Sequence, residues 1–152
     1  MTGKADFNAE EWELVLSAPP DGGLLVATAQ RGGTFREAFS IAKAYTEARR
    51  QAGESELVDQ IVATKPELKV ERHSSKEELE QEVLQKIRDA VALVEQKGTP
   101  EEAEAYRRFA VNLAERVAEA HKEGLLGLSG ERVSETEREA IEKIKEAAGV
   151  TT

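Results

Sequence analysis

The stretch HKEGLLGLSGERVSETE, from His121 to Glu137, has the residue types that most resemble a ligand-binding loop. Its glycines and its charged and hydroxyl side chains raise the possibility of phosphate binding. A phosphate loop needs two glycines with four residues between them, followed by Lys and by Ser or Thr. Here five residues separate Gly124 from Gly130, and Glu131 follows, whose charge would repel a phosphate. The spacing therefore does not predict a phosphate site.

A divalent cation is the second chemistry that this stretch could support. A calcium loop of the helix-loop-helix type needs oxygen-bearing side chains at alternate positions, and leucines occupy those places here. Ser134 starts the next helix, so the main role expected of the loop is to turn the chain. Carboxylates nevertheless flank it, and we take Glu123 and Glu131 as candidate metal ligands. Glu135 and Glu137 are favoured at the start of the next helix for capping and dipole reasons alone.

His73 and His121 are the only histidines, and the chain has no cysteine. Neither histidine stands in His-Glu-x-x-His or Glu-x-x-His spacing, so the helical zinc and di-iron patterns are absent. We expect both to be surface or helix-end residues, and we predict no catalytic residue and no cofactor-binding residue. An enzyme would need a concave pocket that brings His73 or His121 close to carboxylates.

The net charge of the chain limits the classes of partner that it can bind. Thirty acidic and 21 basic residues give a net charge of −9, which repels nucleic acid. The segment from Glu71 to Glu104 contains ten acidic and five basic residues, so it accounts for five of the nine net negative charges. Such a region is typical of a solvated helix surface, and the alternative is a docking surface for a basic partner.

The chain carries no pattern typical of a membrane or secreted protein. The first fifteen residues lack the apolar run of a secretory signal, and the apolar stretch from Gly22 to Ala29 is too short to span a bilayer. We expect a soluble cytoplasmic protein. At 152 residues, the chain has the length of one domain, 1–152.

Sequence signals for the start and the end of a helix recur along the chain. A capping box, in which a polar cap is followed three residues later by Glu, predicts the start of a helix, and a glycine after an apolar stripe predicts its end. The boxes are Asn8–Glu11, Thr34–Glu37, Ser75–Glu78, Thr99–Glu102 and Ser134–Glu137, and the terminating glycines are Gly53, Gly98, Gly124 and Gly149. Phe7 and Trp12 form a hydrophobic staple at the first box, so Trp12 is expected in the core rather than at a binding hot spot.

These signals predict an all-α fold, a single bundle of six or seven helices. Two long helices of about 23 residues, joined by KGTP, should form an antiparallel hairpin. Pro19 to Gly22 should form a tight corner, after which Gly22 to Gln30 forms a separate short central helix covered on most sides. The expected layout is a first helical half at 7–64, a crossing loop at 65–74 and a second helical half at 75–149.

The two halves show a weak internal repeat, since the capping boxes that begin at Thr34 and Ser134 lie 100 residues apart. In the second half, an Ala-rich helix, a glycine turn and a capped helix resemble the TerB (tellurite-resistance) family, whose domains are small, all-helical and built from two helical halves. The matching residues are Ala120, Gly124, Val133, Ser134, Glu137, Ile141, Ile144 and Gly149, with weaker matches at Ala29, Gly33, Glu37 and Ile41.

The resemblance implies a TerB-like arrangement, and in that family acidic turns are implicated in binding divalent cations. The family's Asp before the turn glycine is missing here: Gln30 and Arg31 stand near the first turn and Glu123 precedes Gly124. Our functional prediction is therefore a non-catalytic helical interaction domain with a protein partner. The alternatives are a divalent-cation-binding stress-response domain and, third, an enzyme of unknown class.

Overall fold

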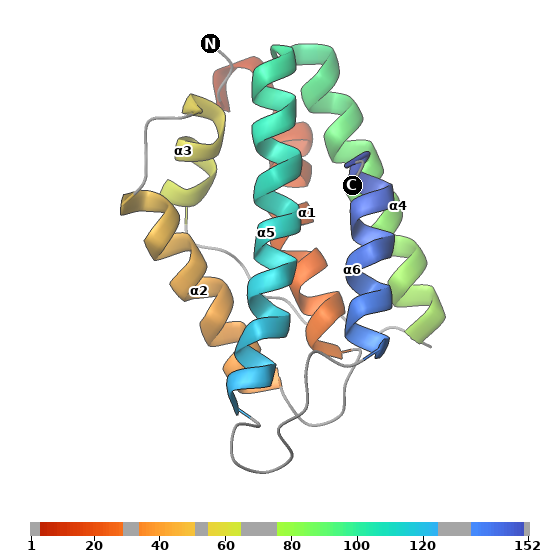
Figure 1. Cartoon of the computed structure of the whole chain (residues 1–152). Helices are drawn as coiled ribbons and strands as arrows, with labels where there is room; N and C mark the ends of the chain where they lie inside the picture. Colours follow the sequence, from red (N-terminus) through yellow and green to blue (C-terminus); the bar gives the residue numbers. More distant parts are fainter. Residues whose placement is uncertain (1–3, 29–33, 51–54, 65–75, 125–134, 151–152) are drawn as a thin grey trace.

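The computed structural model describes residues 4–28, 34–50, 55–64, 76–124 and 135–150. These residues form one bundle of six α-helices with a short 3-10 helix at the N-terminal end, and they contain no β-strand (Figure 1). The all-α prediction is confirmed. The elements are η1 (Lys4–Asp6), α1 (Ala9–Thr28), α2 (Thr34–Arg50), α3 (Glu56–Ala63), α4 (Lys76–Lys97), α5 (Pro100–Gly124) and α6 (Glu135–Ala148).

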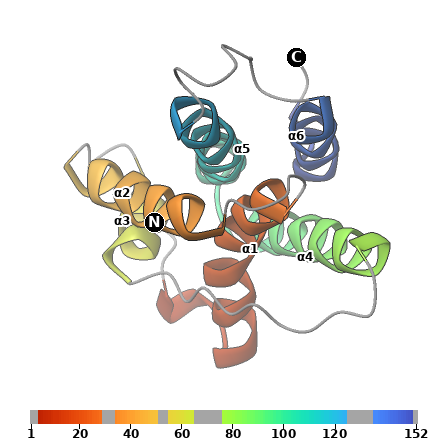
Figure 2. The ribbon, with the colours of Figure 1, turned by 90° about the horizontal axis from the view of Figure 1, so that it is seen from below.

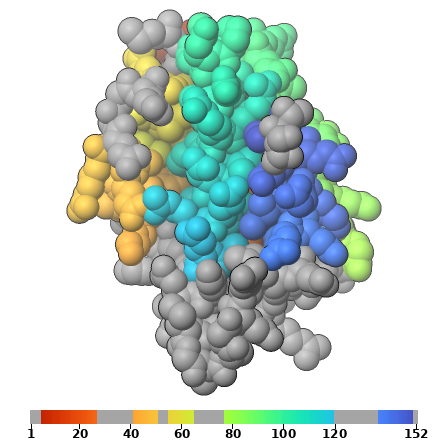
Figure 3. All heavy atoms as spheres, viewed as in Figure 1, coloured from red at the N-terminus to blue at the C-terminus, as the bar shows by residue number. Residues whose placement is uncertain are grey.

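Helix α1 is the centre of the bundle. It packs against α5 and α4 over most of its length and also contacts α2 and α6, which surround it in the view from below (Figure 2). In the space-filling view, little of α1 is visible between α5 and α6 (Figure 3). Leu25 and Val26 are buried, as expected for the small-residue segment after Gly22. The predicted central position of this segment is confirmed.

The predicted corner at Pro19 to Gly22 is wrong, and so is the prediction of a separate helix after it. Helix α1 runs through both prolines without a break, and Pro19 and Pro20 are buried inside it. A proline removes one backbone hydrogen bond and bends a helix, and Figure 2 shows α1 changing direction along its length. Burial against the neighbouring helices therefore overrides the local turn signal.

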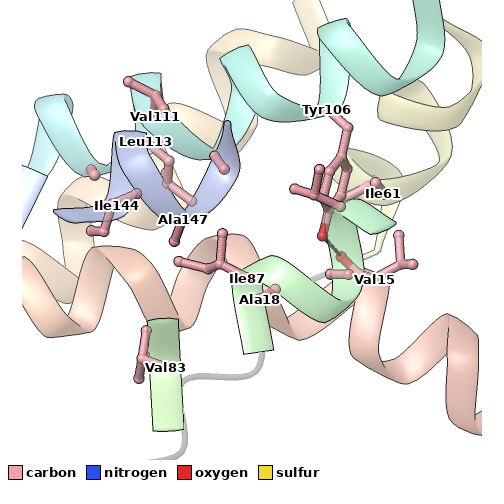
Figure 4. Close-up of a cluster of buried hydrophobic side chains, with 14 of the residues drawn as sticks. Val15, Ala18, Ile61, Val83, Ile87, Tyr106, Val111, Leu113, Ile144 and Ala147 are labelled. Atoms are coloured by element: carbon pink, nitrogen blue, oxygen red, sulfur yellow. Dashed lines mark hydrogen bonds between the residues drawn. The ribbon is translucent and has the colours of Figure 1, made fainter. Parts of the chain in front are cut away.

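The bend has a specific hydrogen bond at its base. Because Pro19 has no N–H, it cannot donate to the carbonyl of Val15, which lies four residues earlier. The hydroxyl of Tyr106 on α5 donates to that carbonyl instead, at 2.7 Å in the buried interior (Figure 4). The polar group that the proline leaves unsatisfied is thus paired from another helix.

The start of α1 follows the sequence signal. The backbone N–H of Asn8 donates to the Glu11 carboxylate at 2.9 Å, and the N–H of Glu11 donates to the Asn8 side chain at 2.8 Å. The rings of Phe7 and Trp12 lie 5.8 Å apart between centroids, which is the predicted staple. Both the cap and the staple are confirmed.

The predicted helical hairpin is confirmed. Helices α4 and α5 have 22 and 25 residues and run in opposite directions from the turn that joins them (Figure 1). The Thr99 hydroxyl accepts from the Glu102 N–H and donates to the Glu102 carboxylate, each at 3.2 Å. Gly98 closes α4 by donating to Val94 at 2.7 Å. Both helices also pack against α1.

The last helix, α6, ends as predicted. Gly149 has a φ of +78°, and the N–H groups of Gly149 and Val150 donate to Glu146 and Lys145. These are the two bonds of a Schellman cap, which favours glycine at the left-handed position. The short helix α3 is capped by Ser55, whose hydroxyl accepts from the Val58 N–H at 3.3 Å.

Other predicted boundaries lie outside the described residues, among them Gly53, Ser75, Ser134 and the loop at 65–74. The division into halves at 7–64 and 75–149, and the relation between them, stay predictions.

Candidate functional site

The predicted cation ligands are only partly placed. Glu131 lies outside the described residues, and so does His73. His121 and Glu123 lie in the last turn of α5, but their side chains are outside the described part of the structure. The candidate site at Glu123 and Glu131 therefore stays a prediction. Among the side chains that are described, no three carboxylates or imidazoles gather as a metal-binding cluster.

Two further residues discussed from the sequence have clear positions. Trp12 is 6% exposed and packs against Phe7, so the interpretation of Trp12 as a core residue is confirmed. Glu137 is 1% exposed in the first turn of α6, and its carboxylate is therefore unavailable as a surface charge.

An exposed acidic surface runs along α4. We define the acidic face as five exposed carboxylates of this helix: Glu77, Glu78, Glu82, Asp89 and Glu95. Residues three and four apart share one side of a helix, and the buried stripe of Val83, Ile87 and Val94 lies on the opposite side. The sequence predicted an acidic region; the structure places its α4 part on the solvent side.

Two basic side chains of α4 are arranged differently from its acids, whereas Arg88 is exposed as the acids are. Lys86 forms an ion pair with Asp21 of α1 at 2.6 Å, and Lys97 forms one with Glu11 of α1 at 2.7 Å. Lys97 also lies 5.7 Å from the centre of the Phe7 ring. Two lysines of α4 are thus directed toward α1, so the acidic face carries more negative charge than the composition of the helix suggests.

The Lys97 pair has an electrostatic signature. The hydrogen bond from Lys97 lowers the pKa of Glu11, and the hydrogen bond from the Asn8 backbone lowers it further. Both donors favour the ionised carboxylate. Glu11 is therefore charged at neutral pH and holds Lys97 at the tip of the hairpin.

Other ion pairs join the helices around the acidic face. Lys143 of α6 donates to Glu80 of α4 at 2.6 Å, and this hydrogen bond raises the pKa of Lys143. Glu95 forms an ion pair with Arg107 of α5. Within the acidic face, Asp89 accepts from Gln85 at 2.9 Å. These exposed pairs orient side chains but add little stability.

The composition of this region gives its net charge but not the direction of its lysines. Lys86 follows the buried Val83 by three residues, and Lys97 follows the buried Val94 by three. That spacing places each lysine at the edge of the buried stripe. The signal was present, but the partners Asp21 and Glu11 lie 65 and 86 residues away in the chain.

Comparison of the chain with protein-family models, curated proteins and solved structures finds no match. The described residues contain no helix that is long and apolar enough to cross a membrane.

Proposed function

We propose that this protein is a non-catalytic interaction domain that binds a partner with a basic surface through the acidic face of α4. The observation that carries the proposal is the direction of the α4 charges. Lys86 and Lys97 pair with Asp21 and Glu11 of α1. The five carboxylates of the acidic face are solvent-exposed, and Arg88 is an exposed base that accompanies them. A surface with one dominant sign of charge accelerates encounter with an oppositely charged partner and disfavours anionic ones.

The TerB-like arrangement belongs to the same proposal. Its support is the residue pattern from Ala120 to Gly149 and the all-helical fold. The alternative is a divalent-cation-binding domain with Glu123 and Glu131 as its ligands.

The test of the proposed function compares two charge-matched variants. One carries Glu77→Gln, Glu78→Gln and Glu82→Gln on the acidic face. The other carries Glu10→Gln, Glu13→Gln and Glu56→Gln, which removes three exposed carboxylates from α1 and α3. Each set includes acids from the first turn of a helix, so the two sets perturb helix dipoles similarly.

The measurement is retention of proteins from host lysate on the immobilised wild-type domain and on both variants, quantified by mass spectrometry. The proposal expects a partner that the α1 and α3 variant retains and the α4 variant loses about tenfold, with elution as salt rises, since exposed charges are screened. Equal loss from both variants indicates general ion exchange and contradicts a specific face. Equal retention by both places the interaction elsewhere and also contradicts the proposal.

A further inference from the structure

The middle of α1 concentrates residues that weaken a helix. Pro19, Pro20, Gly22 and Gly23 fall within five consecutive positions, and all four are buried. Proline and glycine are the residue types least favourable in a helix interior. Sequences usually agree with their fold at the local level, and positions that break this agreement gather at functional or mobile sites.

Backbone hydrogen bonding is also reduced across this segment. Neither Pro19 nor Pro20 has an N–H, so the carbonyls of Val15 and Leu16 have no donor four residues later in the helix. The Tyr106 hydroxyl donates to Val15 from α5, and this bond is buried (Figure 4). A side chain of another helix thus takes the place of a bond within α1.

The parts of α1 before and after this segment are held by different neighbours. We define the N-terminal arm as residues 4–18. Lys97 pairs with Glu11 and donates to the Asp6 carbonyl at 3.3 Å, and Tyr106 donates to Val15. These polar contacts join the arm to the α4–α5 hairpin at the hairpin turn and on α5, and the buried Trp12 and Val15 add apolar packing.

The later part of α1, Asp21 to Thr28, is held by close backbone packing. A Cβ at Gly22 would lie 3.3 Å from Ile87, and a Cβ at Gly23 would lie 3.0 Å from Ile41 and 3.3 Å from Val117. Asp21 adds the ion pair with Lys86. Close backbone approach to helices α2, α4 and α5 fixes this part within the bundle.

We infer that the segment from Pro19 to Gly23 is a hinge, and that the Tyr106 hydroxyl is the latch that holds the N-terminal arm closed. The arm opens as a unit while α4, α5, α6 and the later part of α1 stay folded. Opening separates Val15 from Tyr106 and uncovers the apolar side chains packed there, which include Ile61 of α3 (Figure 4). Opening also separates Glu11 from Lys97 of α4.

Hydrogen exchange followed by mass spectrometry on the full chain tests the hinge. In the wild type, peptides from residues 9–18 exchange faster than peptides from the buried middle of α5, because local opening needs less free energy than global unfolding. Tyr106→Phe speeds exchange in residues 9–18 by about 5- to 30-fold, the range expected when one buried hydrogen bond is lost. Peptides from residues 76–97 and 135–148 change less than about twofold.

Two controls separate a latch from general loosening. Tyr45→Phe removes the hydroxyl of the other buried tyrosine, on α2, and should leave the arm unchanged relative to the rest of the bundle. Pro19→Ala returns the missing N–H, and combined with Tyr106→Phe it should slow the exchange of the arm again. If residues 9–18 exchange at the same rate as α5 in the wild type, or if Tyr106→Phe speeds all helices equally, α1 belongs to one cooperative unit and the inference is overturned.

Discussion

Helices α1 and α5 pack against each other more extensively than any other pair in the bundle, yet they are built in opposite ways. Helix α5 begins with Pro100 after the Thr99 cap and continues for 25 residues without an interior proline or glycine. Helix α1 begins with an equally good cap but contains two prolines and two glycines. Local sequence specifies α5, whereas packing against its neighbours specifies the second half of α1.

The comparison shows where a helix can carry unfavourable residues. An exposed helix depends on its own hydrogen bonds and propensity. A helix in the centre of a bundle gains from burial on most sides, and the hydroxyl of Tyr106 on α5 supplies the hydrogen bond that Pro19 cannot make. In this fold the regular helix α5 thus supplies a hydrogen bond that the irregular helix α1 cannot make for itself.

The largest expected difference between the two helices is their response to proline. Asn112→Pro, at an exposed position in the middle of α5, should lower the free energy of unfolding by about 3 kcal/mol or more. Pro20→Ala in α1 should change it by less than about 1 kcal/mol, because the restored N–H is offset by the loss of a rigid, packed ring. Urea denaturation measures both, with Asn112→Ala as the control. If both substitutions lowered the free energy of unfolding equally, the proposed difference between α1 and α5 would be wrong.

High pH should act on the buried tyrosines, Tyr45 and Tyr106. Burial raises the pKa of Tyr106 well above its ordinary value of 10, and burial together with the charge of Asp21 raises that of Tyr45. The folded state therefore favours the neutral phenols. Stability is intact below the unfolded pKa of about 10, and as pH rises toward the folded pKa it falls by about 1.4 kcal/mol per pH unit for each tyrosine.

Denaturation at a series of alkaline pH values measures this fall, and replacing both tyrosines by Phe should remove most of it. The decline would have to come from other groups, such as lysines, if the double variant lost stability as steeply as the wild type.

The two glycines of α1 should respond unequally to alanine. Each substitution gains about 1 kcal/mol of helix propensity. At Gly23 the new Cβ meets Ile41 at 3.0 Å and Val117 at 3.3 Å, so we expect a net loss of about 1 kcal/mol. At Gly22 the nearest atom is the flexible end of Ile87 at 3.3 Å, and the net change should stay within about 0.5 kcal/mol. Thermal melts measure both variants. If Gly22→Ala melted at a lower temperature than Gly23→Ala, the tighter contact would be the one at Gly22 and the prediction would be wrong.

The smallest expected effect concerns the cation alternative, whose ligands are Glu123 and Glu131. Thermal melts in EDTA and in excess Ca²⁺, Mg²⁺, Mn²⁺ or Zn²⁺ should share one midpoint if the protein is an interaction domain. A cation at about 100 times its dissociation constant would add about 2.7 kcal/mol and raise the midpoint by roughly 5 to 10 °C. A selective rise that Glu123→Gln or Glu131→Gln abolishes would favour the cation-binding alternative.

Prediction from the sequence succeeded where the signal is local. The cap at Asn8, the staple of Phe7 and Trp12, the hairpin turn before Pro100 and the glycine end of α6 all depend on residues within one or two helical turns of each other, and all are confirmed. The acidic region was also found, because charge is a property of composition.

Prediction failed where the outcome depends on residues distant in the chain. Pro19 and Pro20 have the signature of a corner until burial on most sides and the bond from Tyr106, 91 residues from Val15, are taken into account. The directions of Lys86 and Lys97 likewise depend on Asp21 and Glu11, which the topology brings to α4. The acidic region could thus be located from the sequence, but the sequence did not show which of its charged side chains point to solvent and which point to α1.

The burial of Trp12 against Phe7 has a spectroscopic consequence. Trp12 is the only tryptophan of the chain and lies in the N-terminal arm, so fluorescence excited at the red edge of indole absorption reports on the arm alone. Circular dichroism in the far ultraviolet reports on all the helices at once. The two signals superimpose during denaturation if the protein unfolds in a single step, and they separate if the arm is released first.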